Sequence, residues 1–402
     1  MPERFSGEWQ TVKLGECGKF INGNGFPLAY QGKLTGTYPF YKVSDMNNEG
    51  NEFYMSRANN YVSYDIAKTL SCKIIPSDSI VFAKIGAAIF LERKRVTTCD
   101  CCIDNNMMAF LPNSDISSVF MCFVMQRIKF GKLAHTTALP SLTKKNLSGI
   151  RISLPPLDEQ IAIAQTLSAF DRHLANLSEL IAKHEGIRAG ALEDLLSGRT
   201  RLPGFSGAWR TVKLGQVGKW GAGSTPSRSN PAYWLNGRIF WVTNGDLNDY
   251  VITSTKEKIT DEALNIVGLK LKKPGAVVIG TYGTIGTVAV LNIPAAINQN
   301  CCACEVCEEF HNLFIFYALM YHRAQLKSIA SYGAVPHLSK QLLTNYSISV
   351  PPIDEQIAIA QTLSALDLNI TNLKAEHAKI SALRIAAIND LLTGTTRLER
   401  RH

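Results

Sequence analysis

Two stretches of the chain carry apolar residues at the three- and four-residue spacing of an amphipathic helix. The first runs over residues 158–196 and the second begins at Asp354; each follows a Pro-Pro pair and stops before a glycine, Gly198 or Gly394. Acidic residues in the first turn suit the helix dipole. The first stretch predicts a helix about 58 Å long at 1.5 Å per residue, several times the average helix length.

An apolar stripe of this length needs a partner, and the other long helix is the obvious one. We predict antiparallel pairing because the connection from Gly198 to Trp209 is short; parallel pairing is the alternative. Gly186 and Gly190 are expected to allow close approach of the helices, with a kink as the alternative. The residues expected at this interface are Ile161, Leu167, Leu174, Leu177, Ile357, Leu363, Ile370 and Leu373.

The chain repeats itself. Residues 155–171 (PPLDEQIAIAQTLSAFD) and 351–367 (PPIDEQIAIAQTLSALD) are identical at 15 of 17 positions. Residues 5–19 (FSGEWQTVKLGECGK) recur as 205–219 (FSGAWRTVKLGQVGK). The sequence between these blocks has diverged heavily, and this combination of a constant scaffold with two variable inserts is typical of a recognition protein.

The inserts carry short apolar runs beside glycine or proline, which predict β-strands at residues 79–82, 276–279, 288–291 and 348–350. Helices are expected at residues 116–132 and 310–329. The predicted fold class is α+β, with two β-rich mixed globular domains separated by two long helices in an antiparallel coiled coil and a pseudo-two-fold internal duplication. The expected boundaries are 1–152 and 201–348 for the domains, and 153–200 and 349–402 for the helices.

Composition narrows the class of protein. The 402 residues include 42 basic and 33 acidic ones, a net charge of +9 that permits a polyanionic partner. The first residues lack the apolar core of a secretory signal, and no apolar run approaches the ~18 residues of a membrane span. Ten cysteines that include two adjacent pairs suit a reducing compartment. We therefore expect a cytoplasmic protein.

Catalytic motifs are missing from the sequence. We find no P-loop, no Asn/Asp-Pro-Pro-Tyr/Phe methyltransferase motif, no H-E-x-x-H and no G-x-S-x-G. Residues Cys301, Cys302, Cys304 and Cys307 contain one C-x-x-C, but a zinc site prefers two separated ligand pairs. We expect no catalytic residue and no metal, and interpret these cysteines as small buried side chains of a strand.

The two PPxDEQIAIAQTLSAxD segments, the Trp-x-x-Val-Lys-Leu-Gly openings and the Leu-Leu-Ser/Thr-Gly ends resemble the specificity (S, HsdS) subunit of type I restriction–modification systems. The resemblance implies a non-catalytic protein whose two variable regions are target recognition domains, each reading one half of a split double-stranded DNA sequence. It further implies that the helices set the gap and dock methyltransferase (M) subunits, expected as two copies, in a bacterial or archaeal cytoplasm without membrane contact. S-adenosylmethionine and ATP would be bound by the M and restriction (R) subunits, and no cofactor by this chain.

Short stretches of similar sequence occur at matching places in both inserts. Polar side chains on loops beside these stretches are the candidates for DNA contact, since Arg, Lys and Asn can pair with base edges in the major groove. In the first insert they are Lys42, Ser44, Lys84, Arg93, Arg95, Thr137, Ser141 and Lys144. In the second they are Thr243, Asn244, Thr281, Tyr282, His337, Ser339 and Lys340.

Two other functions compete with DNA recognition. A scaffold that grips two partner proteins would show no sequence-dependent DNA binding. A metal enzyme built on the Cys301–Cys307 cluster would hold stoichiometric zinc.

Overall fold

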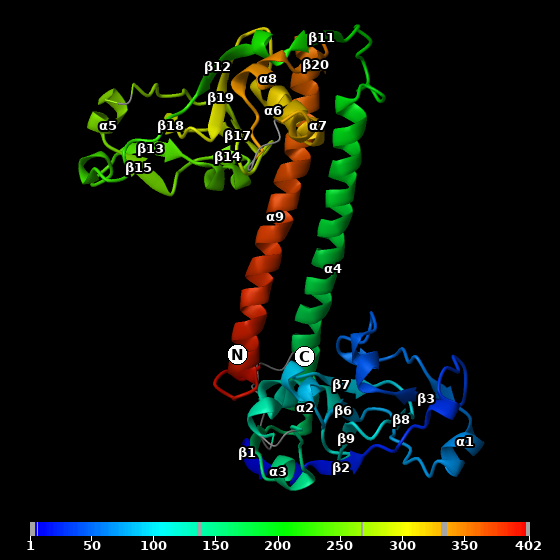
Figure 1. Cartoon of the computed structure of the whole chain (residues 1–402). Helices are drawn as coiled ribbons and strands as arrows, with labels where there is room; N and C mark the ends of the chain where they lie inside the picture. Colours follow the sequence, from blue (N-terminus) through cyan, green and yellow to red (C-terminus); the bar gives the residue numbers. More distant parts are fainter. Residues whose placement is uncertain (1–4, 6, 135–138, 267, 331–335, 399–402) are drawn as a thin grey trace. The chain divides into compact units, whose positions relative to one another are not determined.

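A computed structural model of the chain describes residues 5, 7–134, 139–266, 268–330 and 336–398, without the side chains of residues 248 and 249. The chain forms two compact units. Unit 1 comprises residues 1–177 and 376–402, and unit 2 comprises residues 178–375. Each unit therefore contains one variable insert, the start of one long helix and the end of the other (Figure 1).

The first insert folds as three small sheets. One pairs β1 (Gln10–Lys13) antiparallel with β10 (Arg151–Leu154). The second has the order β2-β9-β6-β7-β4 and the third β5-β3-β8, each mixing parallel and antiparallel pairs. Their strands are β2 (Gly18–Asn22), β9 (Met107–Pro112), β6 (Ile80–Ala83), β7 (Lys94–Thr97), β4 (Tyr54–Met55), β5 (Tyr61–Val62), β3 (Tyr38–Tyr41) and β8 (Cys102–Ile103).

The second insert repeats this topology strand for strand, with sheets β11-β20, β12-β19-β16-β17-β14 and β15-β13-β18. The strands are β11 (Arg210–Lys213), β20 (Ser347–Val350), β12 (Gly218–Ala222), β19 (Cys301–Val306), β16 (Val277–Gly280), β17 (Val288–Leu291), β14 (Val251–Ile252), β15 (Glu257–Ile259), β13 (Ile239–Val242) and β18 (Ala295–Ile297). The predicted internal duplication and β-rich mixed domains are confirmed.

Short helices complete both inserts. The first has α1 (Tyr64–Thr69), α2 (Ser118–Arg127) and α3 (Lys144–Ser148), with 3-10 turns η1 (Leu14–Glu16), η2 (Leu28–Tyr30), η3 (Val43–Asn47), η4 (Ala87–Leu91) and η5 (Phe130–Lys132). The second has α5 (Asp261–Ile266), α6 (Asn312–Tyr321), α7 (Arg323–Ser328) and α8 (Lys340–Asn345), with η6 (Leu214–Gln216), η7 (Pro231–Tyr233) and η8 (Asn244–Asp249).

Two expected helices are shorter than predicted. The first ends at Arg127 because Ile128 is extended, which lets Phe130 turn back against Phe82 with ring centroids 5.0 Å apart. The second is broken at His322, whose backbone leaves the helical region between α6 and α7. Both helices are apolar along most of their sequence, and a helix that is apolar all round is buried.

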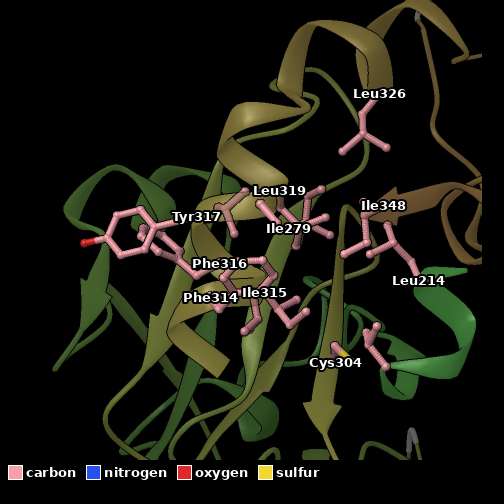
Figure 2. Close-up of a cluster of buried hydrophobic side chains, with 14 of the residues drawn as sticks. Leu214, Ile279, Cys304, Phe314, Ile315, Phe316, Tyr317, Leu319, Leu326 and Ile348 are labelled. Carbon is pink, nitrogen blue, oxygen red and sulfur yellow. The ribbon is translucent and has the colours of Figure 1, made fainter. Parts of the chain in front are cut away.

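The core of the second insert lies where α6 covers the five-stranded sheet. Figure 2 shows Phe314, Ile315 and Leu319 of α6 gathered with Ile279 of β16 and Cys304 of β19. The start of α9 closes the same core, because Ile359 and Leu363 are buried in it. In unit 1, Ile163 and Leu167 at the start of α4 are buried in the equivalent cluster. The constant helices are thus part of the core of each variable domain.

The two long helices are α4 (Leu157–Leu196) and α9 (Ile353–Leu391), as predicted. In unit 1, Glu159 pairs with Arg397 and Asp171 with Arg384. In unit 2 the pairs are Glu355 with Arg201 and Asp367 with Arg188. Residue numbers rise along one helix as they fall along the other, so the pairing inside each unit is antiparallel. No helix in the described part of the chain is long and apolar enough to cross a membrane.

The glycines of α4 do not have the expected role. A Cβ on Gly186 or Gly190 would meet no atom within 4 Å, and both residues are exposed on one continuous helix, so neither close approach nor a break explains them. The predicted stops are confirmed instead. Gly198 and Gly394 adopt φ values of 70° and 74°, where glycine is favoured, and lie against Trp209 and Trp9 respectively.

Candidate nucleic-acid interface

Three chain segments meet at the end of strand β6 in the first domain. The backbone of Lys84 accepts a hydrogen bond from Leu142 N (2.9 Å), and Gly86 N donates to Pro140 O (2.8 Å). Ile85 and Ser141 form a β-bridge. Lys84 N also donates to Asn106 O. This meeting of residues 84–86 with residues 139–142 and with the loop at Asn106 is called the junction below.

Lys84 is the cationic centre of the first junction. Its Nζ donates to Asn22 Oδ1 at 3.3 Å, and its backbone N donates to Asn106 O at 2.8 Å. Burial lowers the pKa of Lys84, and the neighbouring Lys144 lowers it further. Lys144 is exposed as the first residue of α3. Because Lys144 disfavours the charged form of Lys84, an anion bound beside Lys84 would stabilise that charge.

The further candidates of the first domain make their contacts with other parts of the domain. Arg93 donates to Asn47 of η3, beside the exposed Ser44. The Nζ of Lys42 donates to Gln31 Oε1 at 3.0 Å. Arg95 Nε donates to the backbone oxygen of Asn51 at 2.6 Å, so part of its guanidinium is used within the domain. Thr137 lies outside the described residues.

The second domain builds the same junction with different side chains. Leu338 N donates to Thr281 O (2.9 Å), and Tyr282 forms a β-bridge with His337. Asn244 of η8 joins them through Nδ2, which donates to Tyr282 O at 2.5 Å. The rings of Tyr282 and His337 lie 6.2 Å apart, and both residues are exposed. An aromatic pair therefore occupies the place that Ile85 and Ser141 take in the first domain.

The remaining candidates of the second domain mainly hold this geometry. Thr281 is buried, and its Oγ1 donates to Asn300 O at 3.0 Å. Thr243 Oγ1 donates to Asp246 Oδ2 at 2.8 Å, and Ser339 Oγ caps α8 by accepting from Leu342 N at 3.2 Å. Lys340, the first residue of α8, is exposed like Lys144 at the start of α3.

The expected helix-interface residues differ in exposure. Leu167, Leu177, Leu363 and Ile370 are buried; Leu174, Ile357 and Leu373 are half-buried; Ile161 is 41% exposed. The sequence reasoning missed the buried Ile163 and Ile359 and the four ion pairs described above. A signal for the pairs exists, because both partners of each pair recur at an offset of 196, as Asp171/Asp367 and Arg188/Arg384 show.

The cysteine cluster of β19 consists of protonated thiols. Burial raises the pKa of Cys302 to about 11 and that of Cys304 to about 12. Cys301 Sγ donates to Asn244 Oδ1 at 3.2 Å, which ties the strand to the junction. Within the residues that the structure describes, no group of three His, Cys, Asp or Glu side chains could hold a metal ion.

The fold combines two similar mixed-sheet domains with a pair of long helices. Comparison with known sequences identifies the family of proteins that has this architecture. The chain belongs to the family described as the type I restriction modification DNA specificity domain, which matches residues 6–183 and 207–382. It is a DNA specificity subunit of a type I restriction–modification system, with two target recognition domains and no catalytic activity of its own.

Two relatives show the extent of the likeness. The MjaVIII specificity subunit of Methanocaldococcus jannaschii is 24% identical over 98% of this chain and 95% of its own length. The EcoR124I/EcoR124II specificity subunit of Escherichia coli is 29% identical over 41% of each chain. The fold is similar to the crystal structure of the S subunit from M. genitalium, with a TM-score of 0.60, 17% identity and coverage of 98% of this chain and 99% of that chain.

Proposed function

We propose that each target recognition domain reads one half of a split double-stranded DNA sequence through its junction. The observation that carries this proposal is the duplicated junction itself. Two backbone hydrogen bonds match between the domains, because Leu142 N donates to Lys84 O as Leu338 N donates to Thr281 O, and the N–H groups of Lys84 and Thr281 donate to Asn106 O and Asn300 O. A β-bridge follows in each, yet it joins Ile85 to Ser141 in one domain and Tyr282 to His337 in the other. A conserved frame that presents different polar side chains is what two readers of different base sequences require.

The helix pair acts as the spacer between the two readers and as the docking surface for methyltransferase subunits. Continuous helices shared by both units support the first role, because α4 has 40 residues and crosses from unit 1 into unit 2. Exposed apolar side chains support the second, since water-facing apolar groups in number are typical of protein contact surfaces. They are Leu180, Ile187, Leu368, Leu383 and Ile385.

The chemistry belongs to the partner subunits in this proposal. Two methyltransferase subunits bind S-adenosylmethionine and methylate the target, while restriction subunits use ATP, and the assembly works in the cytoplasm of a prokaryote. A solved chain with a TM-score of 0.57 to this one comes from work titled as the complex assembly and conformational transition of the type I R-M system. The functional boundaries are 1–152 and 201–348 for the readers, with 153–200 and 349–402 as spacer helices.

The test is single-molecule methylation sequencing of a host that expresses this chain with its neighbouring methyltransferase gene. We expect methylated adenine at one split motif, lost when this chain is deleted. Exchanging residues 10–150 for those of another specificity subunit should change one half of the motif and leave the other half and the gap unchanged. An unchanged methylome after the exchange, with the methyltransferase shown to be active, would refute the assignment of one half-site to each domain.

A further inference from the structure

The connection after the junction strand differs between the two domains. In the first domain residues 84–93 join β6 to β7, whereas residues 281–287 join β16 to β17 in the second, so the first connection is three residues longer. The extra length forms η4. Phe90 and Leu91 at its end are 53% and 56% exposed and are called the apolar tip below. Each connection also carries a buried isoleucine, Ile89 (2% exposed) in the first and Ile285 (4% exposed) in the second, and the shorter one has no Phe-Leu pair.

The apolar tip is held by a buried ionic clamp. Glu92 adopts φ 56°, and its carboxylate accepts hydrogen bonds from Phe130 N (3.0 Å) and Gly131 N (2.9 Å) while it pairs with Lys94. Lys94 is 1% exposed and donates to Ile128 O at 3.0 Å. Burying a lysine and a glutamate is costly unless their geometry is well satisfied. The clamp therefore fixes a surface feature that adds little to the core.

Close packing also fixes the tip itself. The ring of Phe90 lies against Gly131, where an added Cβ would come within 2.7 Å of Phe90 Cδ1. One face of the ring is thus supported while the other remains in water. Two large apolar side chains presented on a rigid turn are suited to insertion into another molecule, because little conformational entropy is lost on binding.

The position and charge of the tip indicate what it contacts. The tip follows Gly86 of the junction and is flanked by Lys84 before it and Arg93 after it. Cations that precede and follow the tip in the chain suit phosphate contact, and its apolar side chains suit a base step, since wedges of Phe or Leu unstack and kink DNA. A protein partner would not need this arrangement of charge.

We propose that Phe90 and Leu91 form a wedge that the first domain inserts between stacked bases at its half-site, whereas the second domain has none. This inference rests on the proposed reading of a split DNA target by the two domains. Recognition of the first half-site then depends on how easily its base steps can be unstacked, in addition to hydrogen bonds at the junction. The second domain recognises its half-site without such a wedge.

The test uses the complete methyltransferase complex and a duplex that contains the split motif found by methylation sequencing. A 2-aminopurine is placed in turn at each position of either half-site except the methylated adenine and its direct neighbours, where flipping of the target base by the methyltransferase would itself raise the signal. Its fluorescence then reports unstacking by the recognition domains. With the wild-type complex we expect a fluorescence rise at one step of the first half-site only. The F90A/L91A variant should abolish that rise and weaken binding of the target roughly tenfold, about 1.4 kcal/mol.

Controls separate this inference from a loss of fold or of the proposed function. I266A removes an exposed apolar side chain of α5 in the second domain and should change neither fluorescence nor affinity. The single variant L91A, which leaves Phe90 on Gly131, should lose part of the signal at an unchanged thermal midpoint. The wedge is refuted if F90A/L91A unstacks the target like the wild type, or if it loses methyltransferase subunits instead. Absence of sequence-specific binding by the wild-type complex would refute the proposed function itself.

Discussion

In both repeats an aspartate and an arginine form an ion pair between the two long helices. The contact between this ion pair and the neighbouring domain differs between the repeats. In unit 2, Tyr317 of α6 donates through its hydroxyl to Asp367 Oδ2 at 2.7 Å, and Arg188 bridges the same carboxylate. The guanidinium of Arg188 also lies 5.6 Å from the ring centroid of Tyr250. Burial raises the pKa of Tyr317, so its hydroxyl remains a donor. The domain and the helices are thus linked by polar contacts.

Unit 1 has phenylalanines where unit 2 has these tyrosines. Phe53 accepts the same backbone hydrogen bond from β7 that Tyr250 accepts from β17, and Phe123 corresponds to Tyr317 along the matching helix. The rings of Phe53 and Phe123 pack together at 4.9 Å. An open pocket of about 560 Å³ is lined by Phe53 together with Ile161 and Asp171. Apolar packing replaces the polar link.

This difference shows which part of the architecture is constrained. The ion pairs between the helices recur at the same offset, so they fix the register of the helices in each unit. The contact from domain to helix is free to be polar or apolar. A variable domain can therefore be replaced without altering the helix pair on which it sits.

The largest expected effect is one that both units share. Leu167 and Leu363 are fully buried between a helix and its domain, so L167A and L363A should each lower the free energy of unfolding by about 2–5 kcal/mol. Urea titration followed by circular dichroism measures the change. L368A, at a side chain 60% exposed, should stay within about 0.5 kcal/mol. A loss in only one unit would show that the helices are not equivalent core elements.

A smaller effect should distinguish the units. Y317F removes the hydroxyl bonded to Asp367 and should cost about 1 kcal/mol of unfolding free energy. The reverse change, F123Y, places a hydroxyl near Asp171 and should be neutral or stabilising in the same urea titration. If Y317F is neutral, the polar link does not stabilise unit 2. If F123Y is strongly destabilising, the two units do not share this geometry.

A still smaller effect concerns DNA and should be equal in both domains. K144A and K340A each remove one exposed lysine at the start of matching helices. If each contacts a phosphate, the dependence of log affinity on log salt should flatten by about 0.9 for each variant. Titrations of the target duplex with the complex at several salt concentrations measure this slope. An unchanged slope for one variant would exclude phosphate contact by that lysine.

The smallest effect is confined to the first domain. Since burial and Lys144 lower the pKa of Lys84, its charge is present at low pH and is lost as the pH rises, earlier than for an ordinary lysine. Target affinity should therefore fall toward alkaline pH. K84R keeps the charge and should flatten this pH profile, whereas T281V at the matching position should leave it unchanged. A profile that K84R does not alter would remove Lys84 from the charged contacts.

The long helices and the internal duplication were the features of the fold that the sequence predicted best. The helices span about eleven turns each, so their period, caps and stops are read from many residues at once, and repetition at a fixed offset exposes the duplication. Antiparallel pairing followed from the short connection after Gly198. The role expected for Gly186 and Gly190 was wrong because a small residue on an exposed helix face has the same sequence signal as one at a contact.

The candidate site was less predictable because tertiary contacts decide which of its side chains are buried and which are exposed. Arg93, Lys94 and Arg95 are adjacent in sequence, yet Lys94 is buried against Phe130 while Arg95 bonds to a backbone oxygen. Thr281 is adjacent to Tyr282, yet one is buried and the other exposed. No local pattern distinguishes these neighbours, since the distinction depends on strands and turns that lie far apart in the chain.

The discontinuity of unit 1 also sets an order of events during synthesis. Unit 2 is a single stretch, residues 178–375, whereas unit 1 needs residues 376–402 to complete its helix pair. At about 5–20 residues per second, a ribosome takes roughly 10–40 s to make the intervening stretch. Throughout that time the buried carboxylate of Glu159 has no Arg397 to meet. Of the two units, the one that begins earlier in the sequence is therefore completed later, because it closes only when the segment that carries Arg397 has been made.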